Sequence, residues 1–504
     1  MILLYLVKNV NEVEVVSLTQ EQVQHPASKN IDHNLSYLSA ELGVDKSFDL
    51  IQIDLEYAGI KMALFLVDGF AKDEALTQIQ RELEHLKYED LTGDLLKKLI
   101  KSKIPYVEIE TERDLNKVID QVLAGPAALV VDGINEVIII DTRTYPVRGP
   151  EEPDTEQVIR GAKDGFVETL VLNVALARRR VRDRTLRNEY MMIGRRSKTD
   201  ICVTYVEDIA DPLVVKEVKA ALKKIDTDGL PMGDKTIEEY LFGQHNNPYP
   251  LVRYTERPDV AAAHLFEGHV IIMVDGSPSV IITPTTFWHH LQHAEEYRQK
   301  PIIGAALRLV RFSAVWASIF LLPLWLLLAL NPGLLPEGLH YIGPSETGNV
   351  PLLAQFIIAE IGIEMLRMAA IHTPSALATA LGLVAAILIG EVAIEVGLFS
   401  HEVVLYLAVA AVGSFATPSY EMSLANRLVR IVLLLATGIF QVFGYVISVT
   451  LLILLLISMK VYTTPYLWPF IPFSPRSFRD VIFRSPIPLK RQRPKAIHPL
   501  DEDR

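Results

Sequence analysis

The sequence predicts a mixed α/β (α+β) cytosolic region of two subdomains, followed by an all-α, multi-span transmembrane domain. A chain of 504 residues is longer than one hydrophobic core usually organises. Its first 300 residues or so alternate strand-like and helix-like patterns, and half of all residues are hydrophobic. After about Pro301 the chain changes to long uncharged runs that match the thickness of a bilayer.

These changes in pattern divide the chain into five parts. They are an N-terminal extension (1–47), a first α/β subdomain (48–146), a second α/β subdomain (147–300), a transmembrane helical domain (301–461) and a basic, proline-rich cytoplasmic tail (462–504).

Composition excludes several classes of protein. The net charge of -12 argues against nonspecific nucleic-acid binding, which needs a basic surface. Cys202 is the only cysteine, so one chain forms neither a disulfide nor a thiolate metal site, as suits a reducing compartment. The opening "MILLYLVKNV" lacks a basic leader and a cleavage site, so we interpret it as a strand and expect the soluble region in the cytoplasm.

The first subdomain reads as alternating strands and helices. "FDLIQIDLEYAGIKMALFLVDGF" predicts two strands joined through Ala58 and Gly59. Helices follow over 72–86 and 93–102, then a strand over 106–109 and a helix over 112–123. "PAALVVDGINEVIIIDTRTYP" predicts a hairpin that turns at Asp132 and Gly133.

The tripeptide "VDG" occurs three times, each time after an apolar strand. The second and third copies lie in similar surroundings, "ALVVDGINEVIIID" and "VIIMVDGSPSVIIT". A phosphate-binding turn needs a helix after the glycine, and a second strand follows instead, so we predict duplicated or convergent hairpins. The chain also has no GxGxxG or Walker A pattern, and we expect no cofactor.

The second subdomain contains an arginine run and a histidine pair. Pro153 and the acidic residues after it predict the start of a helix. Residues 166–180 predict a helix that ends in a run of arginines. We expect these arginines to be solvated or to face another subunit, beside acidic partners. A hairpin turning at Gly194 follows. His289 and His293, spaced i, i+4, could hold zinc, but HExxH and a third ligand are missing, so we expect a polar helix near the membrane boundary instead.

Five segments are candidates to cross the membrane. They are Phe312–Leu330, Leu352–Ile371, Ala376–Phe399, Val403–Ala416 and Ile431–Met459, the last long enough to bend at Gly438 or Gly444. The basic tail and Arg308 and Arg311 favour both ends of this domain inside. The number of crossings must then be even, so one of the five segments should not cross. The candidates for exclusion are Leu352–Ile371 and Val403–Ala416.

Acidic groups interrupt these segments. Glu391 and Glu395 lie one helical turn apart, and a charge near the bilayer centre costs at least about 2.5 kcal/mol, so it needs a partner or water. Glu360, Glu364 and Arg367 form one polar stripe on another segment. We predict that these five residues are candidates to line a pore. Small residues every four positions, which let a neighbouring helix approach closely, are Ala378, Gly382, Ala386 and Gly390.

Two interpretations of the carboxylates stay open. In one, Glu395 lies at the interface and Glu391 is protonated or bonded to a neighbouring helix, such as the one that bears Arg367. In the other, several copies of the chain surround water and the carboxylates line a cation path. One chain offers too few polar stripes to enclose a pore alone.

Several long segments resemble one family, the A subunits of spore germinant receptors (GerA family). They include "EEPDTEQVIRGAKDGFVETLVLNVALARRRV", "RPDVAAAHLFEGHVIIMVDGSPSVIITPTTF" and "SFATPSYEMSLANRLVR". "FGQHNNPYPLVRYTERPDVAAAHL" and "HHLQHAEEYRQKP" are closer to a branch other than the nutrient-sensing A subunits. The resemblance implies a subunit of the spore's inner membrane that forms oligomeric ion channels opening in germination, beside a transporter-like B subunit.

For that branch the resemblance implies amplification of monovalent cation release, with partners limited to further copies of the chain, a B-subunit-like membrane protein and the bilayer. No catalytic motif comes with the family, and no nucleophile, base and orienter emerge, so we do not expect an enzyme. The alternatives are a non-conducting membrane scaffold, a nutrient-sensing A subunit and a secondary transporter, which usually has more spans and inverted repeats.

Overall fold

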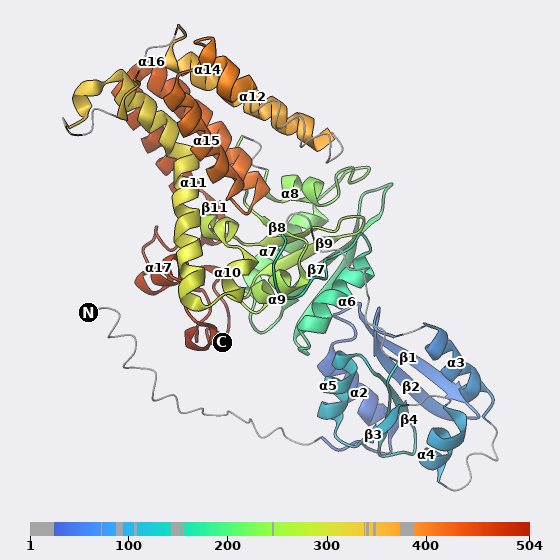
Figure 1. Cartoon of the computed structure of the whole chain (residues 1–504). Helices are drawn as coiled ribbons and strands as arrows, with labels where there is room; N and C mark the ends of the chain where they lie inside the picture. Colours follow the sequence, from blue (N-terminus) through green and yellow to red (C-terminus); the bar gives the residue numbers. More distant parts are fainter. Residues whose placement is uncertain are drawn as a thin grey trace. The chain divides into compact units, whose positions relative to one another are not determined.

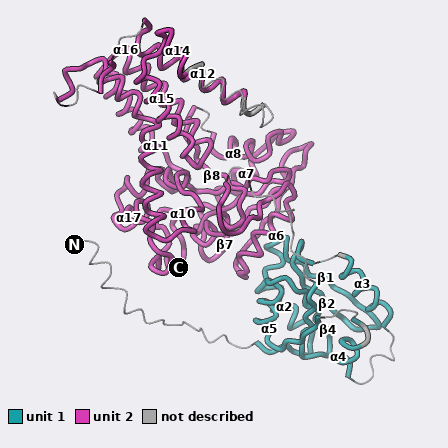
Figure 2. The backbone as a smooth tube through the Cα atoms, in the orientation of Figure 1, with its two compact units in different colours: residues 1–145 teal, residues 146–504 magenta. Residues whose placement is uncertain are grey.

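The computed structural model describes residues 25–503 except for 72, 87–93, 105–107, 143–152, 154–155, 244–245, 337, 339–341, 346–348 and 373–387. The chain forms two compact units, Met1–Tyr145 and Pro146–Arg504 (Figure 2). Unit 1 holds the first α/β subdomain. Unit 2 holds the second subdomain, the helical bundle and the C-terminal tail.

Unit 1 is a five-stranded antiparallel sheet with helices. Its elements are α2 (Ile31–Leu42), β1 (Leu50–Tyr57), β2 (Ile60–Val67), α3 (Asp73–Glu84), α4 (Leu95–Lys98), the π-helical η2 (Leu99–Lys103), β3 (Ile109–Glu112), α5 (Leu115–Ala124), β4 (Ala127–Val131) and β5 (Val137–Ile140). The strand order is β1-β2-β4-β5-β3. Ala58 and Gly59 both have positive φ and close the predicted β1–β2 turn. The α2 helix shows that residues assigned to the extension belong to this fold.

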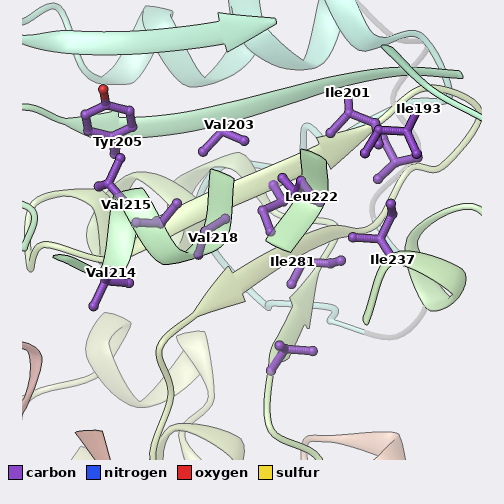
Figure 3. Packing of buried hydrophobic residues seen from close by; sticks show 14 of the residues in the cluster. Ile193, Ile201, Val203, Tyr205, Val214, Val215, Val218, Leu222, Ile237 and Ile281 are labelled. Atoms are coloured by element: carbon purple, nitrogen blue, oxygen red, sulfur yellow. The ribbon is translucent and has the colours of Figure 1, made fainter. Parts of the chain in front are cut away.

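The second subdomain repeats this design at the start of unit 2. Its elements are α6 (Leu170–Arg180), β6 (Leu186–Ile193), β7 (Thr199–Val206), α7 (Pro212–Lys223), α8 (Asp234–Phe242), β8 (Arg253–Thr255), α9 (Pro258–Leu265), β9 (Val270–Val274), β10 (Val280–Thr283), η3 (Phe287–Leu291) and α10 (Ala294–Arg298). The strand order is β6-β7-β9-β10-β8, antiparallel throughout. Val203, Val218 and Ile281 belong to the core between the sheet and α7 (Figure 3).

The two subdomains share strand order and also individual hydrogen bonds. The Asn34 side chain bonds both backbone groups of Ser28, and Asn173 does the same to Val167. The second and third VDG turns each hold the helix of their subdomain: Asp132 accepts from the amide of Ile31, and Asp275 accepts from that of Leu170. The predicted hairpin repeat is confirmed, and it extends to the whole subdomain.

This repeat gives a paired prediction. Replacing Asn173 by alanine leaves the amide and carbonyl of half-buried Val167 without their partner and should cost about 2 kcal/mol of local stability. Amide hydrogen exchange over α6 should accelerate by at least tenfold, with α2 unchanged. Asn34→Ala should produce the reverse pattern. Equal exchange in both helices in either variant would show that these asparagines do not anchor them.

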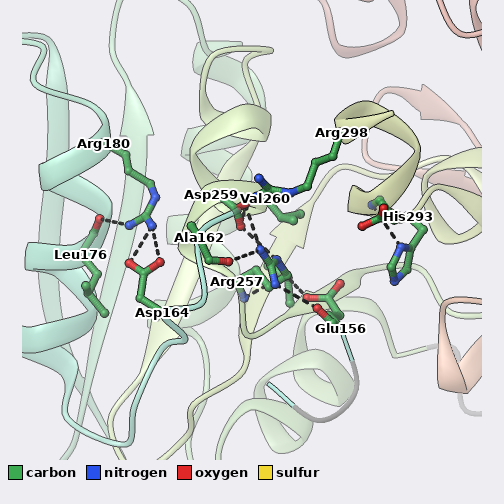
Figure 4. Close-up of polar contacts among 12 residues, drawn as sticks. Glu156, Ala162, Asp164, Leu176, Arg180, Arg257, Asp259, Val260, His293 and Arg298 are labelled. Carbon is green, nitrogen blue, oxygen red and sulfur yellow. Dashed lines mark hydrogen bonds and ion pairs between the residues drawn. The ribbon is translucent and has the colours of Figure 1, made fainter. Parts of the chain in front are cut away.

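Arg257 anchors the segment that precedes α6. Its guanidinium is fully buried, pairs with Asp259 at 3.1 Å and donates to the carbonyls of Glu156 (3.0 Å) and Ala162 (2.8 Å), as Figure 4 shows. These bonds hold the chain over 156–169 without helical structure, so the helix predicted to start at Pro153 is wrong for the described residues. The charged residues next to Pro153 carry no information about a partner as distant in sequence as Arg257.

The arginine run is only partly a surface feature. Arg180 pairs with Asp164 at 2.6 Å in Figure 4, as expected of a solvated cation beside acidic partners. Arg178 is instead fully buried and donates to the carbonyls of Asp183 and Leu186. That guanidinium closes the connection from α6 to β6.

A helical bundle stands on this subdomain (Figure 1). Its elements are α11 (Pro301–Leu330), η4 (Pro332–Leu334), α12 (Leu352–His372), the π-helical η6 (Leu388–Val392), α14 (Ala393–Glu395), α15 (His401–Phe415) and α16 (Tyr420–Ser458). We call the end beside subdomain 2 the near end and the other the far end. α11 runs from near to far, and α12 and α15 run back. At the far end, Ser400 before α15 donates to Gln355 of α12 at 2.8 Å.

Helix α16 doubles back on itself. Gln441 has non-helical φ/ψ of 53° and -127°, which divides α16 into legs over 420–440 and 442–458, each spanning about 25–32 Å. Leu433 and Leu452, one from each leg, belong to one core cluster. The bend lies between the two predicted glycines, and a Cβ on Gly444 would lie only 1.9 Å from the carbonyl oxygen of Ala436. Glycine therefore permits the close approach of the legs.

Two described helices, α11 and α16, are long and apolar enough to cross a membrane. The most apolar stretch of α16 is 11% buried inside the chain, against 44% for α11, and Phe443 is 79% exposed. Such a surface needs lipid or another subunit to cover it. Ile431–Met459 belongs to both legs of α16, so treating it as one crossing missed the return leg. The first half of Ala376–Phe399, up to residue 387, lies outside the described residues.

The C-terminal tail packs on subdomain 2. Its elements are β11 (Lys460–Val461), β12 (Thr464–Pro465), α17 (Pro475–Ile482), η7 (Ile487–Leu489) and η8 (Lys495–Ile497). The Tyr466 hydroxyl donates to the carbonyl of Pro250, and the Phe470 ring stacks on Trp288 with centroids 4.1 Å apart. The tail and subdomain 2 therefore lie at the same end of the bundle.

Candidate functional site in the helical bundle

One arginine links four helices at the centre of the bundle. Arg430 of α16 is buried and pairs with Glu360 of α12, with Nη2 and Oε2 2.8 Å apart. A second contact joins Nε and Oε1 at 2.7 Å but lacks hydrogen-bond geometry. Arg430 also donates to the carbonyl of Ser318 in α11 at 2.6 Å and to the Ser414 hydroxyl in α15 at 3.3 Å.

A second ion pair lies one helical turn away, toward the near end. Glu364 bonds Arg367 on its own helix and Arg427 of α16, the latter at 2.9 Å. Arg367 also donates to the Tyr420 hydroxyl at 2.5 Å. The predicted polar stripe of Glu360, Glu364 and Arg367 is therefore engaged inside one chain. Sequence analysis did not identify Arg427 and Arg430 as the partners of this stripe.

Glu391 and Glu395 lie apart from these pairs. Glu391 is in η6 and Glu395 ends α14, shortly before α15 begins at the far end. Both side chains are exposed on the single chain. Among the described residues, neither has an ion-pair partner. Their carboxylates are therefore available to water, a cation or another subunit.

The small-residue stripe is described at one position only. Gly390 is half-buried, and a Cβ placed there would meet no described atom within 4 Å. Ala378, Gly382 and Ala386 lie outside the described residues. The predicted close packing of this stripe stays a prediction.

Two buried polar groups on α16 add to this region. Asn426, one turn before Arg430, is fully buried, and neither of its side-chain atoms has a hydrogen-bond partner in the described part of the chain. The buried hydroxyl of Thr437 also has no hydrogen-bond partner among the described residues. Unsatisfied buried polar atoms are uncommon in native proteins and often mark a water or a partner. Sequence periodicity gave no signal for either.

A polar cavity of about 300 Å³ opens at the near end, between subdomain 2 and the start of α16. It is lined by charged groups of both signs, among them Glu156, Asp234, Arg253 and Glu421. Burial raises the pKa of the Asp234 carboxyl above its usual range. Charged side chains at the near end of the bundle therefore line a cavity that water can enter.

The histidine pair predicted as a helical motif is split. Residues 287–291 form a 3-10 turn, and His293 then caps α10 by accepting from the amide of Glu295 at 3.2 Å. His289 and His293 therefore do not share a helix face. Because i, i+4 spacing is meaningful only within one helix, that expectation fails here.

The fold and these contacts define a class: two α/β subdomains share one topology, and the second carries a helical bundle with an apolar exterior and buried ion pairs in its interior. The chain matches the family model "Bacillus/Clostridium GerA spore germination protein" over residues 36–496. It belongs to this family, as the resemblance predicted, and membership supports a role in germination.

Individual relatives support this family assignment. The chain is 48% identical to Stage V sporulation protein AF of Bacillus subtilis (strain 168), over 94% of this chain and 96% of that protein. It is 31% identical to Spore germination protein A1 of the same strain, over 82% and 85%. The higher identity to Stage V sporulation protein AF than to Spore germination protein A1 agrees with the predicted likeness to a separate branch of the family.

One solved structure is also similar, the N-terminal domain of the A subunit of the Bacillus megaterium spore germinant receptor GerK3. It has 27% sequence identity and a TM-score of 0.42, and the match covers 53% of this chain and 99% of that one. An "Uncharacterized membrane protein YfkQ" of Bacillus subtilis (strain 168) is 28% identical over 94% of this chain and 92% of its own length. The two apolar helices, together with membership of the family and the similarity to this membrane protein, support a membrane location.

Proposed function

We propose that this chain is a multi-pass membrane subunit of an oligomeric, cation-conducting channel that amplifies ion release during spore germination. Several copies of the chain, together with a B-subunit-like membrane protein, would surround a water-filled path. Subdomain 2 and the tail would face the cytoplasm, and no catalytic step is involved.

The observation that carries the proposal is the contrast between two sets of carboxylates. Glu360 and Glu364 are neutralised by arginines of their own chain. Glu391 and Glu395 are exposed in a chain whose bundle surface is otherwise largely apolar, and a carboxylate there is costly unless water or a cation meets it. Symmetric assembly would bring copies of these residues around one axis.

This contrast revises the set of pore candidates. Glu391 and Glu395 remain the favoured lining residues. Glu360, Glu364 and Arg367 are proposed instead to hold the helices in register, because their charges are already compensated. We expect an even number of crossings, with the return leg of α16 as one of them, and the position of the tail and subdomain 2 at one end of the bundle supports this expectation.

Cation flux tests the proposal. Purified chain, alone or with its B-like partner, is reconstituted into liposomes loaded with potassium. We expect flux from the wild type, and a reduction of at least tenfold, or loss of cation-over-anion preference, for Glu391→Gln combined with Glu395→Gln. Glu239→Gln, an exposed carboxylate on α8, is the matched control and should leave flux unchanged.

Each outcome separates the alternatives. Assembled protein that passes no cations in either preparation would favour a non-conducting scaffold. Flux that starts only when a nutrient is added would favour a nutrient-sensing A subunit. Flux that the double substitution leaves unaltered would place the path away from these two residues.

A further inference from the structure

Three histidines meet in the core of subdomain 2. His264 lies in the last turn of α9, His269 directly precedes β9 and His289 lies in η3, and all three are buried. One ring nitrogen from each lies within 4.8 Å of the nitrogens of the other two. The rings contact at centroid distances of 4.8, 5.1 and 5.8 Å. Spacing along the chain gave no hint of this group, because its members come from three separate elements.

Backbone contacts orient two of these rings so that Nε2 is unprotonated and its lone pair can bind a metal. His264 Nδ1 lies 2.8 Å from the carbonyl of Val260, and His269 Nδ1 lies 3.1 Å from that of His264. A carbonyl only accepts, so each Nδ1 carries the proton and each Nε2 presents a lone pair. His269 Nε2 has no hydrogen-bond partner among the described residues. A backbone acceptor on the second nitrogen is the usual support of a metal-binding histidine.

His289 is held differently but stays compatible with a metal. Its Nδ1 lies 3.0 Å from both the amide and the hydroxyl of Thr286. The amide contact makes Nδ1 an acceptor. If Nδ1 instead donates to the hydroxyl, which both donates and accepts, Nε2 becomes free to bind a metal at the loss of one hydrogen bond.

We propose that His264, His269 and His289 bind one zinc ion through their Nε2 atoms, with water in the fourth tetrahedral position. Neutral imidazoles suit zinc, and Zn–N distances of about 2.0–2.1 Å require the three nitrogens to close to roughly 3.4 Å. Burial supports the neutral state, since it lowers the pKa of His264 to about 3 and that of His269 to about 4.

The site lies beside the surface on which the tail packs. Residues 266–268, between two of the ligands, carry contacts to the tail: Arg493 donates to the carbonyl of Phe266, and Lys490 pairs with Glu267 at 2.6 Å. A metal that fixes the corner from α9 to β9 would therefore also fix the surface on which the tail docks. This inference does not depend on ion conduction.

Cobalt and zinc binding to the purified, tag-free full-length chain in detergent tests the site. After removal of metal, we expect one equivalent of Co²⁺ per chain with the intense visible absorption of tetrahedral coordination, displaced by one equivalent of Zn²⁺. His269→Ala and His264→Gln should each weaken binding at least tenfold. His293→Asn, which keeps a capping side chain on α10, should bind like the wild type.

Three outcomes would overturn the proposal. They are a wild type that binds no metal, binding that persists in both His269→Ala and His264→Gln, and binding that His293→Asn abolishes. A melting curve for each variant establishes that it is folded. If one variant fails that check, the other, together with the wild-type stoichiometry, still decides the result.

Discussion

Replacing Arg430 by methionine should destabilise the helical bundle by about 3–5 kcal/mol, the usual cost of breaking a buried ion pair. The substitution leaves Glu360 buried with no counter-charge and removes the donor to the Ser318 carbonyl. The same residue contacts three other helices, so its loss should loosen the whole bundle rather than one helix end.

The second half of this prediction is a rescue. Arg430→Met combined with Glu360→Leu removes both charges and should recover most of the lost stability, because an apolar pair of similar volume replaces a desolvated ion pair. Unfolding midpoints in mixed micelles measure all three proteins. Arg427→Met is the control and should cost less, since Glu364 keeps its contact with Arg367. A double variant no more stable than Arg430→Met would show that the ion pair is not the cause.

Gly444→Ala should cost about 3 kcal/mol by forcing the legs of α16 apart. The added Cβ would lie 1.9 Å from a backbone carbonyl oxygen, which no side-chain rotation relieves. Gly390→Ala is the matched control: a Cβ there meets no described atom, so we expect a change within about 0.5 kcal/mol.

The free energies of unfolding of these two glycine variants test the close approach of the legs, and distances between spectroscopic probes test it independently. Probes at Leu428 and Leu455, one on each leg, should be close together in the wild type and farther apart in Gly444→Ala. A wild type in which these probes are separated by the length of an unbroken helix would contradict the return of α16.

Much of the fold follows from local pattern. Strands β1 and β2 were predicted because alternating residues flank an Ala58–Gly59 turn, and the hairpins at Asp132 and Asp275 because VDG follows apolar strands. In these cases the determinants are adjacent in sequence, so a short window contains the whole signal.

The missed features depend on partners distant in sequence. The segment over 156–169 is held by Arg257, a hundred residues away, and the return at Gln441 occurs inside a uniformly apolar run. Glu360 looked like a pore residue because its partner, Arg430, lies seventy residues further on. The histidine cluster was missed for the same reason, because i, i+4 spacing paired His289 with His293 rather than with His264 and His269.

Accessibility of substituted cysteines tests most directly whether Glu391 and Glu395 face water in the assembled protein. Cys202 is the only native cysteine and is buried, so a Cys202→Ser background removes it cleanly. In liposomes, Glu391→Cys and Glu395→Cys should react with a charged, water-soluble thiol reagent and lose cation flux as they do. Glu239→Cys should react without loss of flux, and Phe443→Cys, on the apolar face of α16, should not react. Unreactive cysteines at both 391 and 395 would contradict a water-filled path beside these carboxylates.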